Sequence, residues 1–95
     1  MEKRSLYMEK IDAKLIQYNA KLDQMKGKAT EVQVDMKLEY LDQVENLEKR
    51  RDEFMKNHEQ LKVASEHKWE DVKAGTEKTW NELEDAFAKA VARFK

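Results

Sequence analysis

Two histidines carry most of the chemistry that side chains of this chain could perform. The 95-residue sequence contains no cysteine, which excludes disulfides, zinc–thiolate sites and thiol catalysis. His67 precedes Glu70 and Asp71 by three and four residues, so on a helix these three side chains share one face. A di-iron carboxylate bundle needs Glu-x-x-His pairs, and neither histidine has a glutamate three residues before it. His58 and His67 are therefore weak metal-site candidates, and we expect no metal and no cofactor.

The hydroxyl groups offer no nucleophile beside a general base. Ser65 lies two residues from His67, and residues two apart on a helix do not meet. Gly27 and Gly75 stand alone in the sequence and form no phosphate-binding loop. The carboxylates are spread as expected for solvated helix faces. We therefore expect that the protein is not an enzyme.

The composition favours long helices. Charged residues make up 41% of the chain and hydrophobic residues 40%, with two glycines and no proline to form turns. Lysine and arginine total 19 against 20 acidic residues, and this balance disfavours nucleic-acid binding. No apolar run is long enough for a secretory signal or a membrane span, which leads us to expect a cytoplasmic protein.

Apolar residues recur in steps of three and four along three stretches, the period of an amphipathic helix. The first set is Met8, Ile11, Leu15, Tyr18, Leu22, Met25, Ala29, Val32 and Met36. After a slip of four residues, which in a coiled coil is a stutter, the second set is Tyr40, Val44, Leu47, Arg51, Phe54, His58 and Leu61. The third set is Trp69, Val72, Thr76, Trp80, Leu83, Phe87, Ala90 and Phe94. These sets predict helices over residues 2–36, 37–62 and 66–94.

The chain has two candidate helix breaks, near residues 27–30 and 63–67. Gly27 followed by Thr30 and Gln33 resembles a helix stop and a capping box, but the apolar phase continues through Val32 without a slip. We therefore predict an unbroken helix across Gly27. The second break is better motivated, because Ser65 is placed to cap the helix that carries both tryptophans.

The predicted fold class is all-α, one domain over residues 1–95 built from elongated coiled-coil helices. We expect a long helical hairpin or a rod that self-associates, with a three-helix bundle as the alternative. The predicted function is a non-catalytic structural or interaction role, in which a narrow apolar seam binds copies of the chain or a helical partner. The seam comprises Ile11, Leu15, Tyr18, Leu22, Met25, Val32, Tyr40, Val44, Leu47, Phe54, Leu61, Trp69, Val72, Trp80, Leu83, Phe87 and Phe94.

Arg51 and His58 place polar groups within the seam. Such residues set register and partner number in coiled coils, and a histidine layer offers a pH-responsive alternative. A slightly rotated seam would instead include Leu41 and Met55 and leave Arg51 and His58 at its edge.

Charged residues line the edges of the seam. Lys14, Lys21 and Lys28 recur every seven residues beside its first part, and Glu70, Glu77 and Glu84 do so beside its last part. An edge that carries charges of one sign can pair with an oppositely charged edge of the same chain or of another chain. Alternatively, these charges are only solvated.

The aromatic residues of the last segment raise an alternative function at a lipid surface. Trp69 and Trp80 are eleven residues apart and so share one side of a helix with the phenylalanines that follow. An interfacial helix would also carry basic flanks. The acidic edge beside the tryptophans leads us to favour packing between helices over membrane binding.

The stretch "WEDVKAGTEKTW" at residues 69–80, with "LIQYNAKLDQMKGKATEVQVDMKLEYLDQVENLEKRRDE" before it, resembles small bacterial coiled-coil domain proteins. Some of these carry an apolipoprotein-like label, and the group is loosely associated with stress responses. The resemblance implies a bacterial helical protein without an assigned activity.

Overall fold

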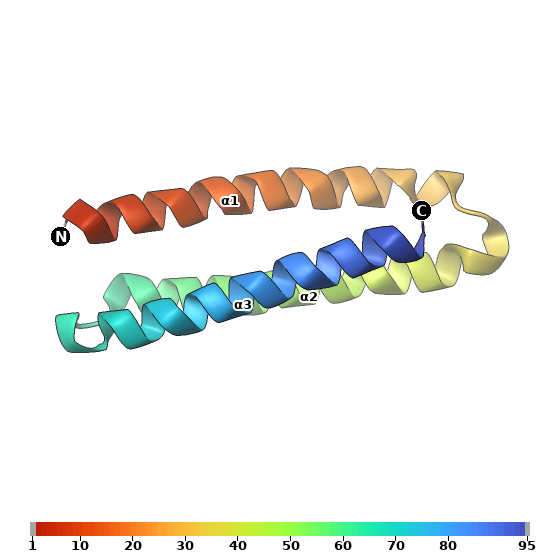
Figure 1. The fold of residues 1–95 in the computed structure, drawn as a ribbon. Coiled ribbons are helices and arrows are strands. Elements are labelled where there is room, and N and C mark those ends of the chain that lie inside the picture. The colour runs from red at the N-terminus through yellow and green to blue at the C-terminus, as the bar shows by residue number, and fades with distance from the viewer. Residues whose placement is uncertain (1, 95) are drawn as a thin grey trace. The chain divides into compact units, whose positions relative to one another are not determined.

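The computed structural model, which describes residues 2–94, consists of helices. α1 spans Glu2–Gly27, the 3-10 helix η1 spans Lys28–Glu31, α2 spans Val34–Val63 and α3 spans Glu66–Arg93 (Figure 1). No β-strand occurs among these described residues. The prediction of an all-α fold is confirmed.

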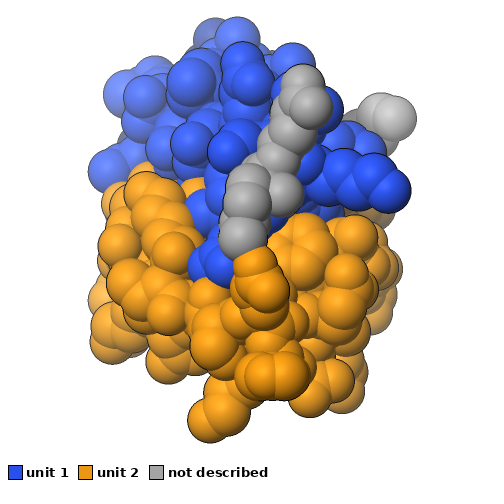
Figure 2. Space-filling model, turned by 90° about the vertical axis from the view of Figure 1, so that its left-hand side faces the viewer, with its two compact units in different colours: residues 1–44 blue, residues 45–95 orange. Residues whose placement is uncertain are grey.

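The chain divides into two compact units, Met1–Val44 and Glu45–Lys95, which Figure 2 shows in separate colours. Unit 1 contains α1, η1 and the first turns of α2, and unit 2 contains the rest of α2 and α3. α2 runs through both units as one helix. A single domain over residues 1–95 stays a prediction.

In unit 1 the chain breaks where we predicted an unbroken helix. α1 ends at Gly27, η1 follows, and α2 begins at Val34. The Val32 N–H donates to the Ala29 carbonyl over 3.3 Å, which closes the 3-10 turn, and Val32 itself is extended. We assigned the slip in the apolar pattern after Met36 to a stutter in a continuous helix. The structure instead has a break between α1 and α2 just before this slip.

The continued apolar phase misled the prediction for a geometric reason. Residues three apart share a side in an α-helix and in a 3-10 helix, so the step from Ala29 to Val32 in the sequence does not distinguish the two. Gly27 has right-handed helical backbone angles (φ −62°, ψ −32°), so the break does not depend on a left-handed glycine. Gly27 and Thr30 have low helix propensity, and the Thr30 hydroxyl donates to the Gly27 carbonyl over 3.3 Å. This bond serves a carbonyl that a helix end leaves without its regular partner.

In unit 2 the chain turns where we predicted. α2 ends at Val63 and α3 begins at Glu66, and within unit 2 α3 runs antiparallel beside α2 (Figure 1). Ser65 occupies the N-cap position with extended angles (φ −68°, ψ 164°), although its side chain makes no capping hydrogen bond. Its carbonyl instead accepts from the Lys68 N–H over 3.1 Å, the first bond of α3. Ser65 therefore occupies the predicted N-cap position but does not cap α3 through its side chain.

Candidate interaction site

The residues of the predicted seam are buried or half-buried within this single chain. The buried members are Ile11, Leu15, Tyr18, Leu22, Met25, Tyr40, Val44, Leu47, Phe54, Leu61, Trp80 and Leu83. The half-buried members are Val32, Trp69, Val72, Phe87 and Phe94. The seam is thus a core of the folded chain, and its role in binding another molecule stays a prediction.

In unit 1 a tyrosine joins the start of α2 to the end of α1. The buried Tyr40 hydroxyl donates to the Met25 carbonyl over 2.6 Å. Met25 lies in the last turn of α1, where carbonyl groups lack a helical partner four residues on. Burial, and secondarily the negative charge of Glu31, raise the pKa of Tyr40 above its usual value. The hydroxyl therefore stays protonated and available as a donor.

In unit 2 an aromatic cluster joins α2 to α3. Phe54 is fully buried and meets the Trp80 ring edge-on, with 5.1 Å between ring centroids and 61° between planes. The His58 ring stacks on Phe54 one turn along α2, at 6.2 Å and 9°. Such aromatic pairs contribute about 0.5–1.5 kcal/mol beyond the area they bury. Trp80 is thus a core residue.

Two threonines of α3 satisfy their hydroxyls inside the same pair of helices. Thr76 is buried and donates to the Val72 carbonyl over 2.9 Å, so its polar atom needs no external partner. Thr79 donates to the Gly75 carbonyl over 2.9 Å and accepts from the Asn57 side-chain amide over 3.2 Å. This last bond crosses from α2 to α3 and fixes their register.

His58 and His67 have different surroundings. His58 is 4% exposed within the aromatic cluster, whereas His67 is exposed at the start of α3. Arg51 is half-buried and forms an ion pair with Asp52 over 3.2 Å. No group of three metal-ligating side chains occurs in residues 2–94. Among the described residues, neither His58 nor His67 therefore belongs to a group of three potential metal ligands.

The rotated alternative for the seam is wrong. Leu41 and Met55 are 45% and 44% exposed, whereas His58 is 4% exposed. His58 therefore belongs to the core itself and not to its edge.

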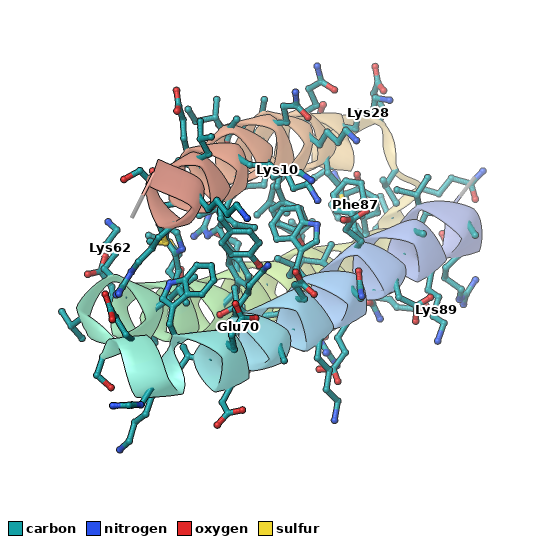
Figure 3. The ribbon with its side chains drawn as sticks, turned by 60° about the vertical axis from the view of Figure 1, so that its left-hand side comes forward. Lys10, Lys28, Lys62, Glu70, Phe87 and Lys89 are labelled. Atoms are coloured by element: carbon teal, nitrogen blue, oxygen red, sulfur yellow. The ribbon has the colours of Figure 1, made fainter. Side chains whose placement is uncertain are left out.

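Exposed ion pairs run along single helices. Figure 3 labels Lys62, which pairs with Glu59 over 3.5 Å, and Lys89, which pairs with Asp85 over 2.9 Å. Exposed pairs of this kind contribute less than about 1 kcal/mol each. They keep the helix faces solvated and do not define a binding site.

A second apolar stripe, which the heptad reading missed, lies on the outer face of α2 in unit 1. Val34, Leu38 and Leu41 are 85%, 73% and 45% exposed. Their spacing of four and three places them in one row, and Tyr40 points about 120° away around the helix. The same period in the sequence could have revealed them, but the seam already accounted for this helix. We call these three residues the outer stripe.

The outer stripe stands in acidic surroundings. Residues 31–44 contain one basic residue, Lys37, and these acidic residues: Glu31, Asp35, Glu39 and Asp42. Asp35 and Asp42 are exposed and seven residues apart, so they form an edge beside the stripe. An apolar row with an acidic edge is complementary to an amphipathic helix with a basic edge.

No helix within the described part of the chain is long and apolar enough to cross a membrane. In comparisons with known proteins, no family model, no curated protein and no solved structure matches the chain. The resemblance to small bacterial coiled-coil proteins therefore stays a prediction.

Proposed function

We propose that this protein is a non-catalytic helical interaction protein that self-associates through helix surfaces outside its core. The observation that carries the proposal is the outer stripe of Val34, Leu38 and Leu41, which the chain leaves exposed in a helical row. Soluble chains rarely align large exposed apolar side chains without a partner for them.

The burial of the seam decides where on the molecule we place this interaction. Leu47, Phe54 and Leu61 are fully buried in unit 2, so a partner would reach them only after the helices separate. Separation would expose an aromatic cluster and break the Asn57–Thr79 hydrogen bond. The outer stripe requires no such opening, and its use by a partner leaves the core intact.

Sedimentation velocity over a concentration series tests the proposal. The wild type should sediment as a mixture of monomer and larger species whose share rises with concentration. The Val34→Ser/Leu38→Ser variant should stay monomeric with unchanged helicity, because both side chains are exposed. A wild type that is monomeric at every concentration would refute self-association.

A lipid surface is a second candidate partner, supported by the ends of α3. The half-buried Trp69 has the Lys73 ammonium 5.3 Å from its ring centroid, and Phe94 has the Arg93 guanidinium at 5.5 Å. Aromatic rings beside cations are typical of helices at a lipid interface.

Vesicles of phosphatidylcholine with phosphatidylglycerol separate this candidate from the first. In a Trp80→Phe variant, Trp69 is the reporter, and lipid contact should shift its fluorescence emission to the blue. In the converse Trp69→Phe variant, the buried Trp80 should shift only if the helices open on the lipid. Unchanged emission of Trp69 at high lipid concentration would exclude the lipid function.

We also propose, on the resemblance and on the sequence alone, a cytoplasmic location and a stress-related role. Growth of a deletion strain under envelope and osmotic stress tests the role.

A further inference from the structure

The charge around the outer stripe limits what can cover it. Two copies that met stripe to stripe would bring Asp35 and Asp42 of one copy against the same acids of the other. Like charges facing each other across an interface are unfavourable. A symmetric contact through this surface is therefore disfavoured, and a basic helix is favoured.

The chain itself carries such a helix. Residues 3–28 contain three acidic residues, Glu9, Asp12 and Asp23, and seven basic ones: Lys3, Arg4, Lys10, Lys14, Lys21, Lys26 and Lys28. Leu6 and Ile16 on α1 are 59% and 71% exposed, and the exposed Ala13 and Ala20 lie on the same side of the helix. We call these four residues the outer face of α1.

A row of lysines borders the outer face of α1. Lys3, Lys10 and Lys21 are exposed, and their spacings of seven and eleven residues place them on one edge of the helix (Lys10 is labelled in Figure 3). Lys14 lies in the same row, seven residues before Lys21. Lysines seven residues apart are about 10 Å apart along a helix, the same rise that separates Asp35 from Asp42.

α1 of the same chain contacts a different side of α2. The Tyr40 hydroxyl bonds the Met25 carbonyl at the end of α1, and Tyr40 lies about 120° around α2 from Val34. This intrachain contact leaves the outer stripe exposed. The outer face of α1 is exposed as well, so both surfaces are open to a second copy.

We propose that the outer face of α1 in one copy docks on the outer stripe of α2 in a second copy, with the lysine row against Asp35 and Asp42. The inference rests on the proposed self-association and names its two surfaces. Because the surfaces differ, the contact is head-to-tail, and the docked pair still offers one free surface of each kind. Assembly therefore continues beyond a dimer, and added salt weakens it.

Reciprocal charge reversal tests the contact in the full-length protein. Variant A carries Lys10→Glu and Lys21→Glu, and variant B carries Asp35→Lys and Asp42→Lys; all four positions are exposed. Sedimentation velocity in low salt from about 10 μM to about 1 mM covers the weak affinity expected of a small interface. Lys68→Glu/Lys78→Glu on exposed positions of α3 changes the net charge as variant A does and is the matched control.

We expect the wild type and the control to form species larger than dimers, and each of A and B to be monomeric. An equimolar mixture of A and B should associate again, because every contact between the two variants joins opposite charges. That recovery also shows that both variants are folded, and far-ultraviolet circular dichroism of each checks this directly.

Other outcomes overturn the inference in distinguishable ways. Association of A or B by itself would show that these surfaces do not form the contact, while self-association as such would stand. Monomeric A and B that fail to recover on mixing would overturn the pairing. A wild type that is monomeric throughout would overturn both the pairing and the proposed function.

Discussion

The hydrogen bond from Tyr40 to the Met25 carbonyl should be a large single contribution to the stability of unit 1. The Tyr40→Phe substitution keeps the ring and removes the hydroxyl. The 2.6 Å bond is buried, so the substitution leaves a buried carbonyl at a helix end without this donor. Loss of one partner of a buried hydrogen bond costs about 1–3 kcal/mol. Urea unfolding followed by circular dichroism should show a lower midpoint with an unchanged slope.

The Thr30→Val substitution is the matched control. The Thr30 hydroxyl also donates to a carbonyl at the end of α1, that of Gly27, but over 3.3 Å and in an exposed position. Water can replace an exposed donor, so the expected loss is below about 0.5 kcal/mol. Equal losses for the two variants, or no loss for Tyr40→Phe, would refute the assignment of Tyr40 as a buried cap of α1.

The same tyrosine predicts a pH dependence. Burial and Glu31 raise the pKa of Tyr40 in the folded chain, whereas the unfolded chain ionises near the ordinary value of about 10. The folded state therefore holds the proton more tightly, and its advantage is complete below pH 10. As pH rises above 10 the unfolded state loses the proton first, so the free energy of unfolding falls. This decrease in the free energy of unfolding should be smaller in Tyr40→Phe. Identical pH profiles for the two proteins would show that Tyr40 is not the source of the pH dependence.

Three further tests of unit 2 use substitutions followed by urea unfolding. Phe54→Ala should lower the free energy of unfolding by about 3–5 kcal/mol, because the ring is fully buried. The control Met55→Ala, at a half-exposed neighbouring position, should lower it by less than about 1 kcal/mol. Similar losses for the two variants would show that Phe54 is not a core residue. Gly75→Ala should raise the free energy of unfolding by about 0.5–1 kcal/mol, since an added Cβ meets nothing within 4 Å in this helix, and a loss would reveal crowding there. Asn57→Ala and Thr79→Val should each cost about 0.5–1.5 kcal/mol, and strictly additive losses in the double variant would show that their 3.2 Å bond contributes nothing.

The two helix breaks show how far periodicity alone leads. The helix break at Ser65 was predictable, because the apolar pattern is interrupted there and serine is a common N-cap residue. The break after Gly27 was not, because Ala29 and Val32 satisfy the spacing of an α-helix and of a 3-10 helix alike. The bond between Tyr40 and Met25 joins residues fifteen apart, and no local pattern encodes it.

The candidate interaction site was likewise predictable only in part. The seam was readable as an apolar row, yet its period is the same whether the row faces another helix of the chain or another molecule. The outer stripe has that period too, but it shares α2 with the seam, and only the fold shows which row is covered.

The sequence by itself determined that the chain is helical and which residues form apolar rows. The lack of proline, the scarcity of glycine and the steps of three and four act within a few residues, so they need no knowledge of distant partners. The tertiary structure decided what covers each apolar row, because coverage depends on contacts between residues far apart in the chain. Phe54 and Trp80 are buried because they contact each other across two helices. Val34 and Leu38 follow the same helical spacing but remain exposed.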